Sequence, residues 1–337
     1  MTLLAAARAG TREVLGALDG SPVLVVELGP GDDLAEEVPA WLPCVVVALS
    51  RQAPVRPAPA GADVGLCPRG ADEPPPGWVA VADVDAEAGR LGEQVGSQPQ
   101  PAAVLAQLLR TSATLDVGAA LVAESLAYSA LQSGAAFAAW LALRRRTPPP
   151  ARQEPDDAVV VARSGDRLTV TLHRPHVRNA VNGALRDALA DALALVAADP
   201  SLAHVDLCGA GQDFSSGGDL DEFGSLPDPA TAHLVRTGRS PARLLAAVAA
   251  RVTAHLHGAC VGAGVELAAF AGRVVATSDT RVQLPEVALG LVPGSGGTVS
   301  IPRRIGRHRT AWLALGASFV DVSTAARWGL VDEIAGG

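Results

Sequence analysis

Two glutamates in the C-terminal half of the chain, Glu266 and Glu286, are the side chains best suited to acid–base chemistry. They lie 20 residues apart. One carboxyl group of such a pair can act as a base while the other supplies a proton. Glu266 falls in the first turn of an expected helix and Glu286 follows a proline, so compensation of the helix dipole and an ordinary helix start are the structural alternatives.

Two loops of small residues share one design, because each follows an expected strand and opens a helix. They cover residues 213–220 (DFSSGGDL) and 257–266 (HGACVGAGVE). Small residues let the backbone approach a ligand closely, and a helix N-terminus presents free N–H groups to negative charge. Two such loops that converge would form an oxyanion hole with two donors, although each loop alone is also consistent with a tight turn.

The elements around these loops alternate between strand and helix, which indicates an α/β fold. The patterns predict a hairpin, a helix that ends at Asp199-Pro200, a short strand, a long helix and two further strands. Their expected ranges are 158–163 and 167–173 for the hairpin, then 182–198, 205–208, 230–251, 252–257 and 273–277.

The chain divides into an N-terminal region at 1–146, a charged, proline-rich linker at 147–157 and a core at 158–337. The N-terminal region shows short apolar runs typical of strands, a long loop, and alanine-rich helical segments that break near Ser133-Gly134. It carries no evident catalytic cluster, so a scaffold or lid is the expected role. The expected strands are 23–28, 44–49 and 78–81, the loop is 52–77, and the helices are 102–110 and 115–146.

Composition excludes several classes of protein. The 337 residues are 49% hydrophobic and 18% charged, unlike a disordered chain, and the net charge of −8 argues against a nucleic-acid partner held by a basic field. All 27 basic residues are arginine. The absence of lysine excludes Schiff-base lysine chemistry and the lysine-bearing phosphate loop. The four cysteines are far apart, without metal-ligand spacing, so we expect reduced thiols and no metal site.

We expect a cytoplasmic protein without a signal peptide or membrane partner. The uncharged segment Ser125–Leu143 has the length of a membrane span and is followed by three arginines. Polar residues near its middle favour a pair of buried helices instead.

The order and spacing of the C-terminal motifs resemble the crotonase (enoyl-CoA hydratase/isomerase) family over residues 158–334. The resemblance rests on Arg174-Pro175 with Arg178-Asn179-Ala180, on FSSGGDL at 214–220, and on 258–266. It continues with Pro285-Glu286, PGSGGT at 293–298 and AARWGLVD at 325–332.

This resemblance implies a ββα superhelical core that binds an acyl-CoA. The backbone N–H groups of Gly218 and Ala263 would hold the thioester oxygen, with alanine where the family usually has glycine. Glu266 and Glu286 match the catalytic glutamates of hydratases, which predicts the hydration of a 2-enoyl-CoA. An enoyl-CoA isomerase, another crotonase-type lyase and a non-catalytic acyl-CoA-binding partner subunit are the alternatives.

The resemblance also implies how the substrate is held. CoA enters as part of the substrate, with no separate cofactor, and Arg174, Arg178 and Ser216 are the candidate contacts. For the arginines, a solvated surface position is the alternative.

Members of this family usually continue in a helical lobe that covers the active site or builds a trimer. Residues 114–146 resemble that lobe, with Glu124, Tyr128, Phe137, Trp140 and terminal arginines at similar spacing. We therefore expect a lobe displaced upstream, or supplied by an eroded first crotonase unit. A homo-oligomer, trimer or hexamer, is the expected assembly.

Overall fold

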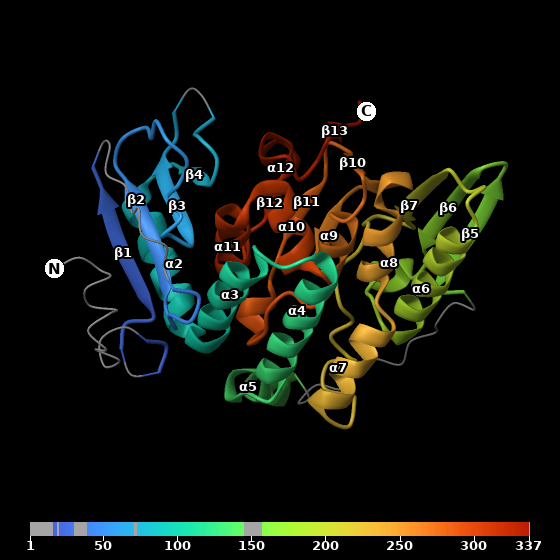
Figure 1. Cartoon of the computed structure of the whole chain (residues 1–337), viewed down its shortest axis with the longest axis horizontal. Helices are drawn as coiled ribbons and strands as arrows, with labels where there is room; N and C mark the ends of the chain where they lie inside the picture. The colour runs from blue at the N-terminus through green and yellow to red at the C-terminus, as the bar shows by residue number, and fades with distance from the viewer. Residues whose placement is uncertain (1–15, 19, 30–38, 71–72, 145–156, 337) are drawn as a thin grey trace.

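A computed structural model describes residues 16–18, 20–29, 39–70, 73–144 and 157–336. Figure 1 shows a small parallel sheet at one end of the molecule, the β5–β6 hairpin at the other, and α3 and α4 between the small sheet and the rest of the core. The predicted linker at 147–157 lies almost entirely outside the described residues. The predicted α/β class is confirmed.

The N-terminal unit is a four-stranded sheet in the order β1-β2-β3-β4, with every pair parallel. All six residues of β2 are buried, as expected for a strand covered on both faces. Helices α2, α3 and α11 pack against this sheet. Its strands are β1 (Val23–Leu28), β2 (Val45–Ser50), β3 (Val64–Pro68) and β4 (Trp78–Val81).

Four helices follow the small sheet and lead toward the core. Asp83 caps the first and Asp116 the third, each through its side-chain carboxylate. The predicted break at Ser133-Gly134 is confirmed, and the two helices that flank it are bent by 67°. These helices are α2 (Val84–Ser97), α3 (Pro99–Ser112), α4 (Val117–Gln132) and α5 (Ala135–Arg144).

The core contains a six-stranded sheet in the order β13-β10-β8-β7-β6-β5 and a three-stranded sheet in the order β12-β11-β9. The predicted hairpin is confirmed as the antiparallel pair of β5 and β6. The strands are β5 (Val159–Ser164), β6 (Arg167–Leu172), β7 (His204–Gly209), β8 (Val252–Leu256), β9 (Ala259–Val261), β10 (Arg273–Ala276), β11 (Arg281–Gln283), β12 (Val320–Asp321) and β13 (Glu333–Ile334).

Helices of the core cover these sheets and open directly from the strand ends. The predicted helix 182–198 is confirmed, with Asn182 as its cap. The helices are α6 (Gly183–Ala198), α7 (Pro229–Gly238), α8 (Pro241–Val248), α9 (Ala263–Ala268), α10 (Gly297–Ile305), α11 (Arg307–Gly316) and α12 (Val322–Trp328), with 3-10 turns η1 (Pro175–Val177), η2 (Ala249–Arg251) and η3 (Glu286–Leu289).

Two sequence-based predictions of elements are wrong. The expected loop 52–77 contains β3, because a five-residue buried strand between proline-rich segments carries too little pattern to stand out. The expected long helix 230–251 is interrupted at Arg239, where Ser240 caps α8 and Pro241 occupies its first turn. Proline has no N–H with which to continue the hydrogen bonds of a preceding helix, but it is favoured in the first turn of a new one. The chain therefore ends α7 and starts α8 at this point.

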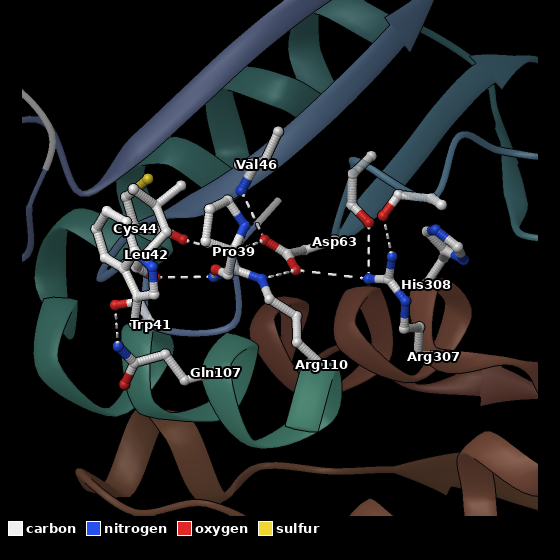
Figure 2. Close-up of polar contacts among 12 residues, drawn as sticks. Pro39, Trp41, Leu42, Cys44, Val46, Asp63, Gln107, Arg110, Arg307 and His308 are labelled. Carbon is white, nitrogen blue, oxygen red and sulfur yellow. Dashed lines mark hydrogen bonds and ion pairs between the residues drawn. The ribbon is translucent and has the colours of Figure 1, made fainter. Parts of the chain in front are cut away.

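A buried ion cluster attaches the small sheet to the helices beside it (Figure 2). Asp63 is 2% exposed and accepts hydrogen bonds from the Val46 N–H at 2.8 Å and from Arg110 Nε at 2.8 Å. Arg307 of α11 lies 3.6 Å from the same carboxylate and donates to the Ala62 carbonyl at 2.8 Å. One acidic side chain therefore joins β2, α3 and α11.

The small sheet repeats the strand order of part of the core. In the core, β7, β8, β10 and β13 are neighbours in that order and all pair in parallel, as do β1 to β4. The interpretation of the N-terminal region as an eroded crotonase unit stays a prediction.

Candidate active site

A cavity of about 730 Å³ lies between the N-terminal helices and the core. Helices α4 and α5 form one wall, and α7 and α8 form another. The predicted catalytic and oxyanion-hole residues all line it, namely Gly218, Ala263, Glu266 and Glu286. The structure thus brings together residues that lie up to 68 positions apart in the sequence.

The two small-residue loops contact each other at the floor of this cavity. Ser215 pairs with Cys260 in a parallel bridge, and the Val261 N–H donates to the Ser215 carbonyl at 3.0 Å. Gly217 has φ +91° and Gly262 has φ +48°, and a Cβ on Gly217 would lie 2.8 Å from the Val261 oxygen. Only glycine permits this approach of two backbones.

The next residue in each loop is a predicted oxyanion donor. Gly218 follows Gly217, and Ala263 is the first residue of α9. Within the described part of the chain, no acceptor takes a hydrogen bond from either N–H. Two unpaired amides on one cavity wall can stabilise a developing oxyanion.

Glu266 lies in α9 and is 2% exposed. Its Oε2 accepts hydrogen bonds from the Ser295 N–H at 2.7 Å and the Gly297 N–H at 2.9 Å. Burial, and then the negative charge of Glu286, raise its pKa well above the usual value, while the two amide bonds oppose that rise. This carboxylate therefore has donors that favour its charged form.

Glu286 opens η3 and is 8% exposed. Its Oε1 lies against Gly262, where a Cβ could not fit, and its Oε2 is buried with no hydrogen-bond partner in the described structure. Burial raises the pKa of this carboxyl group to about 8. Because a neutral carboxyl carries an O–H donor, Glu286 is suited to deliver a proton into the cavity.

The upstream lobe contributes a third buried carboxylate, Glu124 of α4. It accepts hydrogen bonds from the Gly296 N–H at 2.7 Å, the Thr298 N–H at 2.9 Å and the Thr298 hydroxyl at 2.7 Å. Alternate amides of the 295–298 loop therefore bond Glu266 and Glu124. Sequence reasoning used Glu124 only as a marker of the lobe, because nothing local in α4 signals a partner 172 residues away.

The predicted CoA contacts lie outside this cavity lining. Arg174 is 1% exposed and forms an ion pair with Asp219 at 3.1 Å, so the expected phosphate contact is replaced by a structural role. Arg178 is 56% exposed and its Nε bonds Asp213 at 2.5 Å. Ser216 is half-buried and donates to the Val177 carbonyl.

Two further findings concern groups and segments named above. Among the described residues, no cluster of three or more His, Cys, Asp or Glu side chains has the geometry of a metal site. No single helix in that part of the chain has the length and apolarity to cross a bilayer. The bent pair of α4 and α5 reaches the required length and apolarity only when the two helices are taken together.

Comparison with known proteins places the C-terminal half in a family. The model of the enoyl-CoA hydratase/isomerase family matches residues 165–336. The chain is 34% identical over 176 residues to 2,3-dehydroadipyl-CoA hydratase of Escherichia coli (strain K12), a match that covers 52% of this chain and 68% of the relative. It is 29% identical over 180 residues to a probable enoyl-CoA hydratase of Mycobacterium tuberculosis, covering 53% and 68%.

A solved structure shows the same likeness. The crystal structure of an enoyl-CoA hydratase from Mycobacterium smegmatis superposes with a TM-score of 0.50 at 29% identity, covering 54% of this chain and 70% of that one. The matched segment contains both small-residue loops and both predicted glutamates. The chain therefore belongs to the enoyl-CoA hydratase/isomerase (crotonase) family.

Proposed function

We propose that this protein adds water to the double bond of a 2-enoyl-CoA. The observation that carries the proposal is the cavity itself, in which two unpaired backbone amides and two buried glutamates lie on one surface. The names of the relatives support hydration as the reaction. Oxyanion stabilisation and proton transfer are the two things that hydration of a thioester-conjugated alkene needs.

In the proposed reaction, the Gly218 and Ala263 N–H groups donate to the thioester oxygen. The Glu266 carboxylate takes a proton from water as the water oxygen forms a bond to Cβ. The electron pair of the double bond moves toward the thioester oxygen, which gives an enolate. Glu286 then gives its proton to Cα as the enolate collapses. The product is a 3-hydroxyacyl-CoA, and proton exchange between the two glutamates and solvent resets the site.

The surroundings of each glutamate support this division of roles. Glu266 has two amide donors that stabilise its negative charge, whereas one buried oxygen of Glu286 has no hydrogen-bond partner among the described residues. Burial raises the pKa of both carboxyl groups, so the hydrogen bonds, and not the pKa values, distinguish the two. Two like charges in one buried site resist simultaneous ionisation, so in the proposed reacting state Glu286 carries the proton and Glu266 the negative charge.

The alternative functions make weaker use of this geometry. An isomerase of this family typically needs one acid, at the position of Glu286. A non-catalytic acyl-CoA-binding subunit would use the two amides, but it gains nothing from burying two carboxyl groups at the cost of their solvation. The retention of both glutamates in one cavity favours hydration.

The holding of CoA and the assembly complete the proposal. Arg178 is the candidate for a CoA phosphate, because its side chain is exposed and only its Nε is bonded among the described residues. Ser216, in the adjoining loop, is the second candidate. The trimer or hexamer and the cytoplasmic location stay predictions.

The test is turnover of crotonyl-CoA and of a 3-enoyl-CoA, with the products identified by mass. Glu286→Gln should lower kcat by about 10²–10⁴-fold, which is the usual contribution of a general acid, while CoA still binds in a calorimetric titration. Glu333→Gln, an exposed change in β13, is the matched control. Undiminished turnover by Glu286→Gln would reject the assignment, and double-bond migration without hydration would identify an isomerase.

A further inference from the structure

An arginine of α7, Arg236, lines the cavity opposite the catalytic loops. Its guanidinium group is held by the lobe helix α4. Nε donates to Ser125 Oγ at 3.1 Å, Nη1 to Gln132 Oε1 at 3.2 Å, and Nη2 to the Ser125 carbonyl at 3.2 Å and to Ser129 Oγ. Every one of these acceptors is uncharged.

The guanidinium group retains donor capacity. It carries five N–H bonds, and the four hydrogen bonds leave one N–H of Nη1 without an acceptor in the described structure. No carboxylate of the described residues forms an ion pair with Arg236. The negative charge of Glu124 acts on Arg236 without contact, because the oxygens of Glu124 accept hydrogen bonds from the amides of Gly296 and Thr298.

Arg236 contacts the ring of Tyr128, which in turn contacts the segment that holds Glu266. Its guanidinium carbon lies 4.5 Å from the centroid of the Tyr128 ring, and the other contacts of that ring include the backbone of Gly294, which leaves no room for a Cβ there. The residue after Gly294, Ser295, holds Glu266. Arg236 and the two glutamates therefore line one cavity and are connected through Tyr128 and the 294–295 segment.

A partly desolvated cation that no carboxylate contacts is costly, and a ligand with a negative charge would lower that cost. We infer that the natural acyl group carries a carboxylate at its far end, and that Arg236 of the cavity wall receives it. This inference rests on the proposed function. The phosphates of CoA do not fit the requirement, because the whole pantetheine arm separates them from the thioester.

Two substrates of equal carbon number test the inference in the unmodified protein. They are 2-hexenoyl-CoA, with a methyl terminus, and 2,3-dehydroadipyl-CoA, with a terminal carboxylate. Both carry the same CoA, so the ratio of their kcat/KM values reports only the acyl end. A hydrogen bond to a charged group predicts a ratio of about 10–100 in favour of the carboxylate.

Arg236→Gln should reduce this ratio at least about tenfold, and Arg236→Lys, which keeps the charge, should restore part of it. Arg167→Gln, an exposed change in β6, should leave the ratio as it is. A wild-type ratio at or below one, or a ratio that Arg236→Gln does not change, overturns the inference while hydration itself stands. If neither substrate is hydrated, the proposed function fails as well.

Discussion

Three buried carboxyl groups share the cavity, and their surroundings differ residue by residue. Glu124 accepts three hydrogen bonds and Glu266 accepts two, all from the loop at 295–298, whereas one oxygen of Glu286 accepts none. Burial raises the pKa of each group, to about 7 for Glu124 and about 8 for Glu286. The site therefore concentrates groups that are expensive to ionise, as acid–base catalysis requires.

The raised pKa of Glu286 predicts how stability depends on pH. Its folded value of about 8 exceeds the unfolded value of 4.5, so its contribution to stability is fully present below pH 4.5 and is lost as the pH rises toward 8. Glu286→Gln, which cannot ionise, should unfold at a higher temperature than the wild type, by a margin that grows from pH 5 to pH 8. Thermal unfolding at several pH values measures this margin. A constant margin would contradict the raised pKa.

Glu124 should be a positioning residue, acting on the reaction through the loop that holds Glu266. Glu124→Gln replaces one acceptor oxygen by an N–H₂ group that faces backbone donors, which costs about 1–3 kcal/mol and loosens the loop. We expect kcat to fall at least about tenfold, with a smaller change in KM and a shifted pH profile. Thr298→Val, which removes only the hydroxyl donor, should have a smaller effect on each. Wild-type kcat and pH profile in Glu124→Gln would exclude this role.

Among the individual residues of the cavity, those that belong to local sequence motifs were predictable from the sequence. Glu266 and Glu286 were predictable because each follows a recognisable loop or proline. The burial of Arg174 was not, because it depends on Asp219, 45 residues away. Arg236 was missed for the same reason, since its partners all lie on a helix more than 100 residues upstream.

The junction of β2, α3 and α11 is the feature that matters most at the scale of elements. Asp63 and Arg110 are both nearly inaccessible there, with 3% and 5% of their side chains exposed. Arg110 also donates to the carbonyls of Leu42 and Cys44, at 2.8 and 2.7 Å. The junction thus fixes the small sheet to the helices that lead to the cavity.

Breaking this junction should destabilise the fold more than a surface ion pair does. Asp63→Asn leaves Arg110 buried without a full counter-charge, which typically costs about 3–5 kcal/mol. Asp85→Asn breaks an exposed, solvent-screened pair with Arg51 and should cost far less. Denaturant titration monitored by circular dichroism gives both values. Equal losses would show that the buried cluster adds nothing.

Long elements with clear end signals were predictable from the sequence, and short ones were not. The helix 183–198 and the hairpin were evident because long periodic segments end at Asn, Pro or a glycine turn. Strand β3 was not predicted, because five residues between proline-rich segments are too few to show the alternating pattern of a strand. Helix α2 was not expected, because three glycines interrupt its apolar pattern, and only the packing of Leu91 and Val95 against the sheet makes it a helix.

Across the whole molecule, the two units have unequal roles. The order β1-β2-β3-β4 mirrors β7-β8-β10-β13, and the helices that follow the small sheet close the cavity of the other unit. That an eroded first unit supplies the lobe stays a prediction. The resemblance of residues 114–146 to such a lobe pointed there, but alanine-rich helices have no side-chain pattern that could specify the surface they cover.

The core without this lobe should not work. A fragment of residues 157–337 loses Glu124, Tyr128 and the apolar faces of α4 and α5, which exposes the cavity and frees the 295–298 loop. We expect no measurable turnover and loss of cooperative unfolding, checked by activity and calorimetry. A stable and fully active fragment would show that the N-terminal region is dispensable.

The bonds from Glu124 to Gly296 and Thr298 span 172 and 174 residues of chain. Glu124 is synthesised long before Gly296 and Thr298. The carboxylate of α4 therefore leaves the ribosome before the amides that donate to it exist. Contacts between residues so far apart in the sequence form slowly. Assembly of the catalytic wall should accordingly be a late event of biosynthesis, completed only after the polypeptide has been translated beyond Thr298.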